Sequence, residues 1–265
     1  MTLLEIGNLT KRFRSGGRDI SALNEVSLTL EAGQTLGLAG ASGSGKSTLA
    51  RILMRLLPPD TGSIRFDRED WLALTGSELR RRRAKIQMVF QDVLGAFNPR
   101  ATIGSVLDDP LRIHGVVPKR ERPRKIAELL DRVGLPANLS DRLVSDVSGG
   151  QRQRIAIARA IATEPVLIVL DEAVSALDVS VRGKILELLV DLQRERGIAY
   201  LFVSHDLAAL RAVSHRVAVM DGGRLVETGP ARQVFGNPHS AAARALVSAV
   251  PRLVTGPPQG PSHEF

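Results

Sequence analysis

Residues 40–48, which read GASGSGKST, constrain the fold of this chain more than any other stretch. They lie between an apolar segment, 36–39, and a helical pattern that begins at Lys46. Glycine loses more conformational freedom on folding than any other residue, so a cluster of glycines at such a junction needs a compensating use. A glycine-rich turn between a strand and a helix directs backbone N–H groups and the helix N-terminus at a bound anion. The stretch therefore predicts a phosphate-binding loop.

The spacing within this stretch fits the phosphate-loop pattern G-x-x-x-x-G-K-[ST]. Lys46 is expected to reach the β- and γ-phosphate oxygens, and Ser47 offers its hydroxyl to Mg²⁺. The alternative is a glycine-rich turn with an incidental lysine, but a strand and a helix lie on the correct sides. The helix is expected to run to Leu57, before Pro58 and Pro59. The residues expected to surround the phosphates are Gly40, Ala41, Ser42, Gly43, Ser44, Gly45, Lys46, Ser47 and Thr48.

The composition excludes several classes of function. With 265 residues the chain can bury one large core or two. Cysteine is absent, so there is no disulfide framework, thiolate metal site or cysteine nucleophile. No apolar run approaches the roughly 20 residues that a membrane-spanning helix needs, so any membrane role would come through a partner. The net charge of +8 is compatible with an acidic partner, nucleic acid or an anionic membrane surface.

The periodicity predicts a mixed α/β architecture. Residues 3–30 alternate apolar and polar residues around Gly16-Gly17, which is typical of antiparallel strands. From residue 166 onward, strand-like runs alternate with helical ones and indicate a parallel sheet with crossover connections. Residues 101–147 have a helical pattern that we expect to be broken at Pro110, Pro118, Pro123 and Pro136.

A second motif is VLIVLDE, residues 166–172. The aliphatic run predicts a strand buried on both faces, and the carboxylates at its C-terminal end emerge where α/β sheets bind ligands. Asp171 is expected to be an outer ligand of Mg²⁺, and Glu172 to orient or deprotonate an attacking water. Two adjacent acids are more often a solvated helix start, so this interpretation depends on the preceding aliphatic strand and on the phosphate loop.

A third motif is SGGQ, Ser148 to Gln151, which precedes an apolar-periodic helix. The start of such a helix is a second anion site, with a serine hydroxyl and free N–H groups. An ordinary serine N-cap would explain Ser148 but not Gly149 and Gly150. A chain with two phosphate cradles either binds two nucleotides, or each cradle covers half of a shared one.

The order of phosphate loop, Ser-Gly-Gly-Gln and aliphatic-Asp-Glu resembles the ATP-binding cassette ATPases, and the resemblance extends from about Leu3 to Pro251. In that family the Ser-Gly-Gly-Gln helix faces the phosphate loop of a second cassette, and two ATP molecules are sandwiched between the two. The resemblance implies that Ser148, Gly149, Gly150 and Gln151 face the ATP of a partner.

Four further positions resemble functional residues of the family. Gln91, in QMVFQD, corresponds to the glutamine that contacts Mg²⁺ and the attacking water. Asp178, in SALD, corresponds to the aspartate of a loop that touches the opposite subunit. His205, in LFVSHD, corresponds to the histidine that senses the γ-phosphate, and Phe13 sits where an aromatic ring would stack on adenine.

The resemblance implies ATP and Mg²⁺ as cofactors and assigns roles to the residues above. The implied catalytic residues are Glu172, His205, Gln91 and Lys46. The implied Mg²⁺ ligands are Ser47, Gln91 and Asp171. Phe13 joins the phosphate loop in binding ATP.

The implied fold is a P-loop NTPase core of the ABC ATPase type, with a mainly parallel sheet, an antiparallel β subdomain and an α-helical subdomain. The cassette is expected to span residues 1–252, followed by a disordered tail at 253–265. The expected boundaries are a β subdomain within 1–32, a P-loop core over 33–91 and 151–230, and a helical subdomain over 92–150.

The resemblance also implies partners and a location. Two transmembrane permease subunits, a second and paralogous ATPase subunit, and indirectly an extracytoplasmic solute-binding protein are expected, with no nucleic acid. The chain would lie peripherally on the cytoplasmic face of the inner membrane. No residue here should touch the solute.

Within the family, residues 87–100, 110–115 and 234–251 resemble the ATPase subunits of nickel and peptide importers. Peptide-importer subunits usually have Pro-Thr after the catalytic glutamate, whereas this chain has Ala173-Val174, as nickel-import subunits often do. A stretch that often reads His-Pro-Tyr-Thr is here HSAA, residues 239–242. The chain is therefore expected to be most similar to nickel-import ATP-binding subunits. We expect it to energise uptake of nickel or of a small peptide-like solute across the inner membrane, with a dipeptide or oligopeptide importer as the alternative.

Two alternatives come from other classes. A soluble cassette ATPase acting on nucleic acid or ribosomes would agree with the positive charge. Repair-type enzymes, however, need a long coiled coil or zinc cysteines, and translation-type enzymes need two cassettes in one chain. A regulatory module that holds ATP without turnover would not need both Glu172 and His205. The run Arg80 to Arg83 is interpreted as a solvated helix face.

Several apolar residues have a predicted place as well. Leu94 and Phe97, which follow Gln91, are expected to be partly exposed anchors for a permease, the alternative being that they cap the helical core. Trp71 and Tyr200 are expected to pack in the core.

Overall fold

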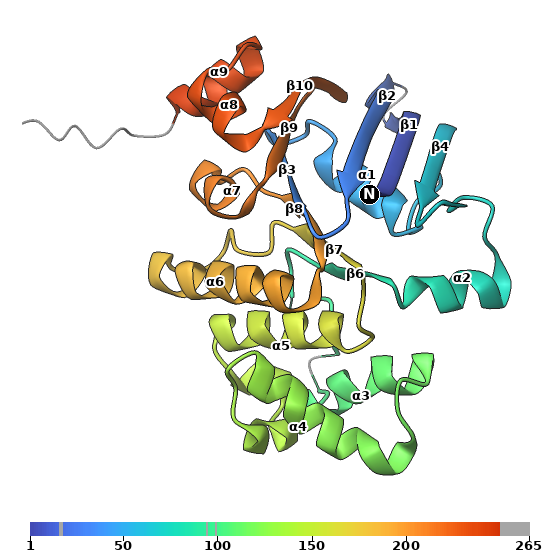
Figure 1. The fold of residues 1–265 in the computed structure, drawn as a ribbon, viewed down its shortest axis with the longest axis vertical. Coiled ribbons are helices and arrows are strands. Elements are labelled where there is room, and N and C mark those ends of the chain that lie inside the picture. Colours follow the sequence, from blue (N-terminus) through green and yellow to red (C-terminus); the bar gives the residue numbers. More distant parts are fainter. Residues whose placement is uncertain (16–17, 94, 99, 250–265) are drawn as a thin grey trace, which may run out of the picture.

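The computed structural model describes residues 1–15, 18–93, 95–98 and 100–249, so the expected tail at 253–265 lies outside the described residues. Residues 2–70 contribute all the strands of a four-stranded antiparallel sheet with the strand order β2-β1-β4-β5. Its strands are β1 (Thr2–Ser15), β2 (Arg18–Glu31), β4 (Thr61–Phe66) and β5 (Glu69–Asp70). Figure 1 shows this sheet beside the central strands.

A six-stranded sheet with the order β10-β9-β3-β8-β7-β6 forms the centre of the molecule. The neighbours from β9 to β6 are parallel, and only β10 pairs antiparallel. Every residue of β3, β7 and β8 is buried, as their continuous aliphatic runs require. The strands are β3 (Thr35–Gly40), β6 (Ile86–Val89), β7 (Leu167–Asp171), β8 (Ala199–Val203), β9 (Arg216–Asp221) and β10 (Arg224–Pro230).

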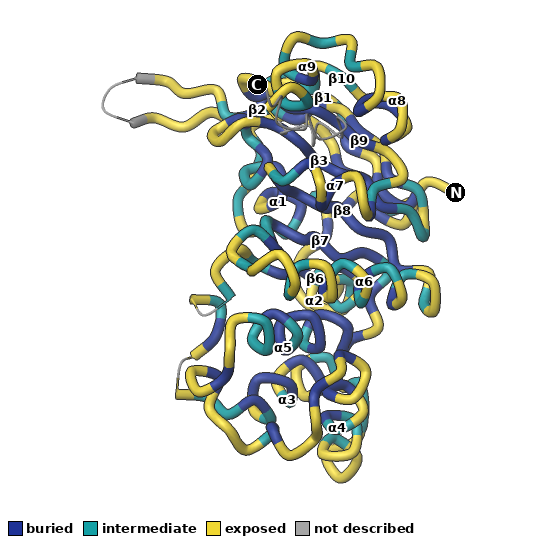
Figure 2. The backbone as a smooth tube through the Cα atoms, turned by 90° about the vertical axis from the view of Figure 1, so that its left-hand side faces the viewer, coloured by how far each residue is buried: buried dark blue, intermediate teal, exposed yellow. Residues whose placement is uncertain are grey.

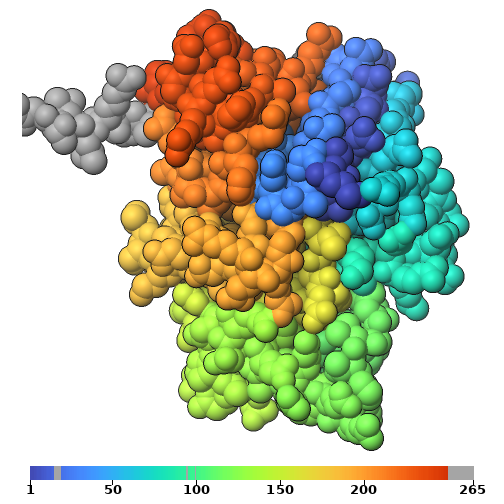
Figure 3. Space-filling model, viewed as in Figure 1, coloured from blue at the N-terminus to red at the C-terminus, as the bar shows by residue number. Residues whose placement is uncertain are grey.

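Helices surround the central sheet and form a separate layer at one end. In Figure 1, α3 and α4 lie below α5, α2 projects sideways, and α8 and α9 lie at the opposite end. Figure 3 shows the green helical residues as the lower lobe of the molecule. The helices are α1 (Lys46–Leu53), α2 (Gly76–Arg83), α3 (Ile103–His114), α4 (Arg122–Arg132), α5 (Gly149–Ile161), α6 (Val179–Arg196), α7 (Leu207–Val213), α8 (Ala231–Gly236) and α9 (Ala241–Ser248). Three short 3₁₀ segments are η1 (Lys119–Glu121), η2 (Ala137–Asp141) and η3 (Val144–Asp146).

Two local expectations are wrong. Pro110 does not break a helix but lies inside α3. Proline removes one hydrogen bond from a helix, but here the ring is buried on the same apolar face as Val106 and Leu107, and this packing retains the helix. The first helix ends at Leu53, before the prolines, because Arg55 takes a left-handed φ of 55°.

The antiparallel sheet also extends beyond the expected range of 1–32. Strand β4 pairs with β1 in the register Leu4 to Phe66 and Ile6 to Ile64, so residues 61–70 belong to the same sheet. Between β1 and β4 the chain forms β2, β3, the phosphate loop and α1, so this sheet is built from segments that are discontinuous in sequence.

Two hydrophobic clusters hold the layers together. One joins the antiparallel sheet, α1 and one face of the central strands, and the other joins the helical lobe to the opposite face. Trp71 and Tyr200 are buried as predicted, and each uses its polar atom: Trp71 Nε1 donates to the Leu53 carbonyl at 2.7 Å, and Tyr200 Oη to the Leu189 carbonyl at 2.9 Å. The buried central strands are visible in Figure 2.

None of the helices in the described part of the chain is long and apolar enough to span a membrane.

Candidate active site

The phosphate loop connects β3 to α1, and its glycines have positive φ angles of 154° at Gly40, 78° at Gly43 and 106° at Gly45. A Cβ atom at Gly40 would lie 2.4 Å from the Met220 carbonyl oxygen, and one at Gly45 would lie 2.3 Å from the Ala22 carbonyl oxygen. A Cβ at Gly43 would meet nothing within 4 Å. Two of the glycines therefore allow close backbone packing, and the third lies on the open side of the loop.

Lys46 lies at the centre of this loop and is buried. Its Nζ donates to the carbonyl oxygens of Gly40 at 2.8 Å and Ala41 at 2.7 Å, and to Ser44 Oγ at 3.3 Å. Burial lowers the pKa of Lys46, while the nearby Glu172 and Asp171 oppose that shift. A buried ammonium held by neutral oxygens favours an additional anion, so the loop fits a phosphate group.

Ser47, in the first turn of α1, lies beside Asp171, the last residue of β7. Ser47 Oγ donates to Asp171 Oδ1 at 3.1 Å, and Asp171 is buried. Burial raises the pKa of Asp171, the bond from Ser47 lowers it, and the Glu172 carboxylate raises it further. A hydroxyl and a carboxylate oxygen side by side are ligands that Mg²⁺ accepts when phosphates supply others. The pair therefore fits a magnesium ion bound together with a nucleotide.

Glu172, Gln91 and His205 form a cluster beside that pair. Glu172 Oε2 accepts a hydrogen bond from Gln91 Nε2 at 3.3 Å and lies 3.1 Å from His205 Nδ1. The Glu172 side chain is 16% exposed and that of His205 is 59% exposed. Glu172 has a left-handed φ of 50°, a strained conformation that clusters at functional sites, and its N–H donates to the Val203 carbonyl at 2.9 Å.

One cavity of about 590 Å³ brings Lys46 and Ser47 together with the Glu172 cluster, and its size suits a small-molecule ligand. The buried Asp171 is not among its lining residues. The sequence-predicted residues that line it belong to the phosphate loop and to the carboxylate cluster. Three residues of β2, Ile20 to Ala22, also line it, although sequence reasoning did not select them. The lining residues are Ile20, Ser21, Ala22, Ser42, Gly43, Gly45, Lys46, Ser47, Thr48, Gln91, Glu172 and His205.

Phe13 is not among the residues that line this cavity. It is 37% exposed and pairs across the β1–β2 ladder with Ile20, which does line the cavity. Cross-strand partners share one face of a sheet, so Phe13 lies beside the wall that Ile20 forms. Lys11 Nζ lies 5.7 Å from the centroid of its ring.

The SGGQ motif starts α5 and is well formed in the isolated chain. The Ser148 Oγ accepts from the Gln151 N–H at 3.3 Å, and Gln151 Oε1 accepts from the Ser148 N–H at 3.0 Å, which makes a capping box. Neither residue lines the cavity that contains Lys46. Asp178, at the start of α6, is exposed. Within one chain, the structure does not bring these residues to the phosphate loop.

The exposure of Phe97, in the loop after Gln91, differs from the expected one. Phe97 is only 8% exposed, packs in the cluster of the helical lobe, and has the guanidinium of Arg159 5.6 Å from its ring centroid. The expectation of a partly exposed anchor is therefore wrong for Phe97, and the alternative, that it caps the helical core, holds. Leu94 lies outside the described residues.

The arginine run forms the last turn of α2, a helix without a buried residue. Arg82 pairs with Asp67 at 3.4 Å and also with Glu69, while Arg80, Arg81 and Arg83 are exposed. The solvated helix face agrees with the sequence interpretation.

A family profile described as ABC transporter matches residues 23–175, and the chain belongs to this family. Its fold is that of an ABC ATPase with a P-loop NTPase core, which binds ATP and uses Mg²⁺. The chain is an ATPase domain of the ABC transporter class.

Among curated proteins, the chain is 49% identical over 256 residues to the glutathione import ATP-binding protein GsiA of Escherichia coli (strain K12). It is 48% identical over 256 residues to the protein of the same name from Shigella boydii serotype 4 (strain Sb227). Each alignment covers 94% of this chain and 41% of the relative. The chain thus spans about two fifths of the length of these relatives.

Two solved structures extend the similarity to the fold. The dimeric ATP-binding cassette MJ0796, in a post-hydrolysis state bound to ADP and Pi, matches with a TM-score of 0.79 and 32% identity over 87% of this chain and 99% of that one. The cbiO1 protein from Clostridium perfringens, part of the ABC transporter complex cbiONQ, matches with a TM-score of 0.78 and 28% identity over 89% and 91%.

Proposed function

We propose that this chain is the ATP-hydrolysing subunit of an importer and energises the uptake of a small peptide-like solute. The observation that carries the proposal is the single cavity in which Lys46, Glu172 and His205 meet, in a chain 49% identical to a glutathione import ATP-binding protein over 94% of its length. The cavity supports a hydrolytic site, and the import function in the names of the relatives supports the direction of transport.

Nucleotide binding would use the phosphate loop. The loop N–H groups and the α1 N-terminus face the phosphates, and Lys46 exchanges its bonds to the Gly40 and Ala41 carbonyls for bonds to phosphate oxygens. Ser47 and Asp171, together with Gln91, would hold a magnesium ion, and that ion would supply positive charge beside the phosphates. The adenine would lie toward β2, where Ile20 forms the wall and Phe13 is its neighbour.

Hydrolysis would use the carboxylate cluster. Gln91 and His205 both contact Oε2 of Glu172, so within the described residues Oε1 remains available to accept a hydrogen bond from water. Glu172 would orient that water and accept its proton as the water oxygen attacks the γ-phosphorus. His205 would fix the carboxylate and contact the γ-phosphoryl group. The protein thus contributes mainly position and charge.

A complete site would need a second cassette. Ser148, Gly149, Gly150 and Gln151 present a capped helix N-terminus away from the cavity, which suits the ATP of a facing cassette. The dimeric state of MJ0796 supports this arrangement. The exposed Asp178 would contact the facing subunit. We infer that the partner is a paralogous ATPase and that ATP links the two by mass action.

Coupling to transport would use further subunits. Two transmembrane permeases and, indirectly, an extracytoplasmic solute-binding protein would complete the importer, with this chain on the cytoplasmic face of the inner membrane. The import function in the names of the relatives supports this composition.

The solute class is proposed from the relatives described above, which are named for glutathione import, and glutathione is a peptide. Ala173-Val174 and the HSAA stretch, which favour nickel, lie in the ATPase and not in a solute path. Deleting this subunit should abolish uptake of radiolabelled glutathione or dipeptides and leave Ni²⁺ accumulation unchanged. Loss of Ni²⁺ accumulation with intact peptide uptake would assign the chain to nickel import instead.

A further inference from the structure

Arg182, in the first turn of α6, connects two segments that flank the carboxylate cluster. Its Nη1 pairs with the Asp206 carboxylate, and its Nη2 donates to the Leu177 carbonyl at 3.0 Å. Leu177 belongs to residues 175–178, here named the dimer loop, and Asp206 belongs to residues 204–206, here named the switch segment. A single guanidinium therefore joins the loop that ends at Asp178 to the segment that contains His205.

Asp206 is fixed in place by hydrogen bonds besides its pair with Arg182. Its Oδ1 accepts from the N–H groups of Ala208 at 2.8 Å and Ala209 at 3.2 Å, and its own N–H donates to Ser204 Oγ at 3.0 Å. The side chains of Arg182 and Asp206 are 26% and 17% exposed, so the ion pair is partly shielded from water. Such a charge-assisted pair is stronger than an exposed one.

The contacts close a ring through the reacting carboxylate. Ser175 Oγ donates to the Glu172 carbonyl at 2.9 Å, which fixes the start of the dimer loop to Glu172. His205 Nδ1, at 3.1 Å from Glu172 Oε2, completes the ring from the other side. The members of the ring are Glu172, Ser175, Leu177, Arg182, Asp206 and His205.

Helix stability does not explain an arginine at this position. A cation in the first turn lies at the positive end of the helix dipole and is unfavourable there. Asp178, the N-cap of α6, makes no side-chain capping bond that would offset it. The bonds to Asp206 and to the Leu177 carbonyl are the contacts that stabilise the guanidinium at this position. Lysine, a point charge, cannot reproduce this two-pronged geometry.

We propose that Arg182 is a positioning residue that couples the dimer loop to the switch segment, so that contact of a facing cassette with Asp178 stabilises the contact that His205 already makes with Glu172 in the single chain. The proposal rests on the proposed function, because it assigns a path by which the second cassette completes the hydrolytic site.

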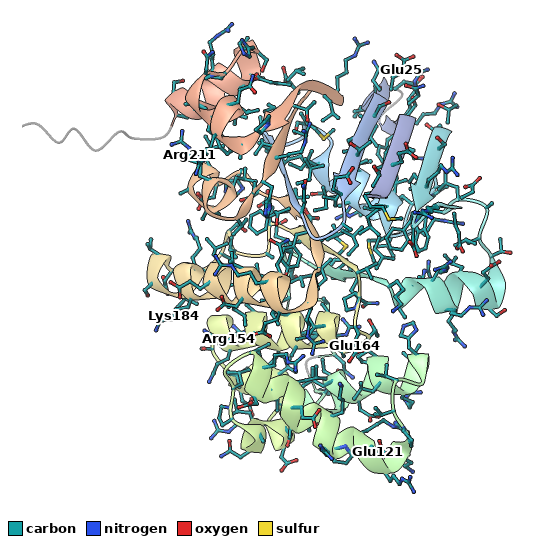
Figure 4. All side chains as sticks on the ribbon, viewed as in Figure 1. Glu25, Glu121, Arg154, Glu164, Lys184 and Arg211 are labelled. Atoms are coloured by element: carbon teal, nitrogen blue, oxygen red, sulfur yellow. The ribbon has the colours of Figure 1, made fainter. Side chains whose placement is uncertain are left out.

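The coupling can be tested without nucleotide by hydrogen–deuterium exchange of the full chain. Arg182→Gln should speed exchange in both the dimer loop and the switch segment by about fivefold, as expected for the loss of a local contact of moderate strength. Asp206→Asn should speed exchange in the distant dimer loop as well. The control is Lys184→Gln, which removes one charge from an exposed position of the same helix (Figure 4) and should change neither segment. Faster exchange in only one of the two segments for Arg182→Gln, or in the switch segment alone for Asp206→Asn, would overturn the coupling.

The effect on turnover is tested in the assembled complex. Arg182→Gln should lower kcat by about tenfold and leave KM for ATP within about twofold, since Arg182 does not touch the nucleotide. The double variant with Asp206→Asn should be no slower than the slower single variant, because both remove the same contact. Arg182→Lys, which keeps the charge, should recover only part of kcat. Additive effects, or a raised KM with kcat intact, would overturn the proposal. If wild type itself did not hydrolyse ATP, the proposed function would fail while the exchange result still decided the coupling.

Discussion

Replacing Gly45 by alanine should destabilise the fold far more than the same replacement at Gly43. Both residues have positive φ, 106° and 78°, and both belong to the phosphate loop. At Gly45 an added Cβ would lie 2.3 Å from the Ala22 carbonyl oxygen, whereas at Gly43 it would meet nothing within 4 Å. The pair therefore separates backbone strain from steric overlap.

The magnitudes follow from these two terms. A left-handed backbone disfavours alanine by about 1–2 kcal/mol, which applies to both variants. The oxygen that alanine would overlap at position 45 belongs to the backbone of β2, which pairs with β1 and cannot turn aside as a side chain would. Overpacking against such a neighbour adds about 1–3 kcal/mol. We expect losses of about 2–5 kcal/mol for Gly45→Ala and about 1–2 kcal/mol for Gly43→Ala.

Urea denaturation without nucleotide measures both losses. Trp71 is the sole tryptophan and is fully buried, so its fluorescence reports global unfolding. Free energies of unfolding come from linear extrapolation, with the slope compared between variants. Equal losses for the two variants, or a larger loss at Gly43, would refute the claim that β2 contacts the loop at Gly45.

Three further predictions concern the reacting residues. Glu172→Gln should retain ATP, because the phosphate loop is intact, but lose most of its turnover and accumulate a nucleotide-bound dimer by size-exclusion chromatography. Lys46→Ala should instead weaken ATP binding in a fluorescent-nucleotide titration, since a charge on the phosphates is lost. Asp171→Asn should raise Tm at pH 7 without Mg²⁺ or nucleotide. Burial raises the pKa of Asp171 above its ordinary value of 3.8. At a pH above the raised pKa the carboxyl is ionised and its burial opposes folding, whereas below pH 3.8 it is protonated in both the folded and the unfolded chain and has no such effect. The Tm gain should disappear as pH falls below about 4, and a gain that persisted there would contradict this cause.

The elements that carry the site were predictable because their signals are local. An aliphatic run followed by glycine or by two acids indicated β3 and β7, and one of the helical runs expected after residue 166 is observed as α6. Their motifs meet in one cavity because the C-terminal ends of parallel strands share one edge of the sheet.

Other features depend on contacts between distant residues and leave no local signal. Leu4 pairs with Phe66, although the phosphate loop lies between them in the sequence, and the alternation of apolar and polar residues within either strand does not indicate this pairing. Pro110 stays in a helix because tertiary packing outweighs its local preference. Ile20 lines the cavity because the β1–β2 hairpin extends beside the phosphate loop. Phe97 looked exposed in a polar loop, but the helical lobe covers it.

A site shared between two cassettes is tested by the specific ATPase activity of the chain, measured as a function of its own concentration at saturating Mg²⁺ and ATP. The cavity with Lys46 and Glu172 does not include the SGGQ motif of the same chain, and under the proposed function a complete site needs two cassettes. Specific activity should be low in dilute solution and rise with protein concentration toward a plateau, by mass action. Full activity that does not change over a roughly hundredfold range of chain concentration would contradict the shared site.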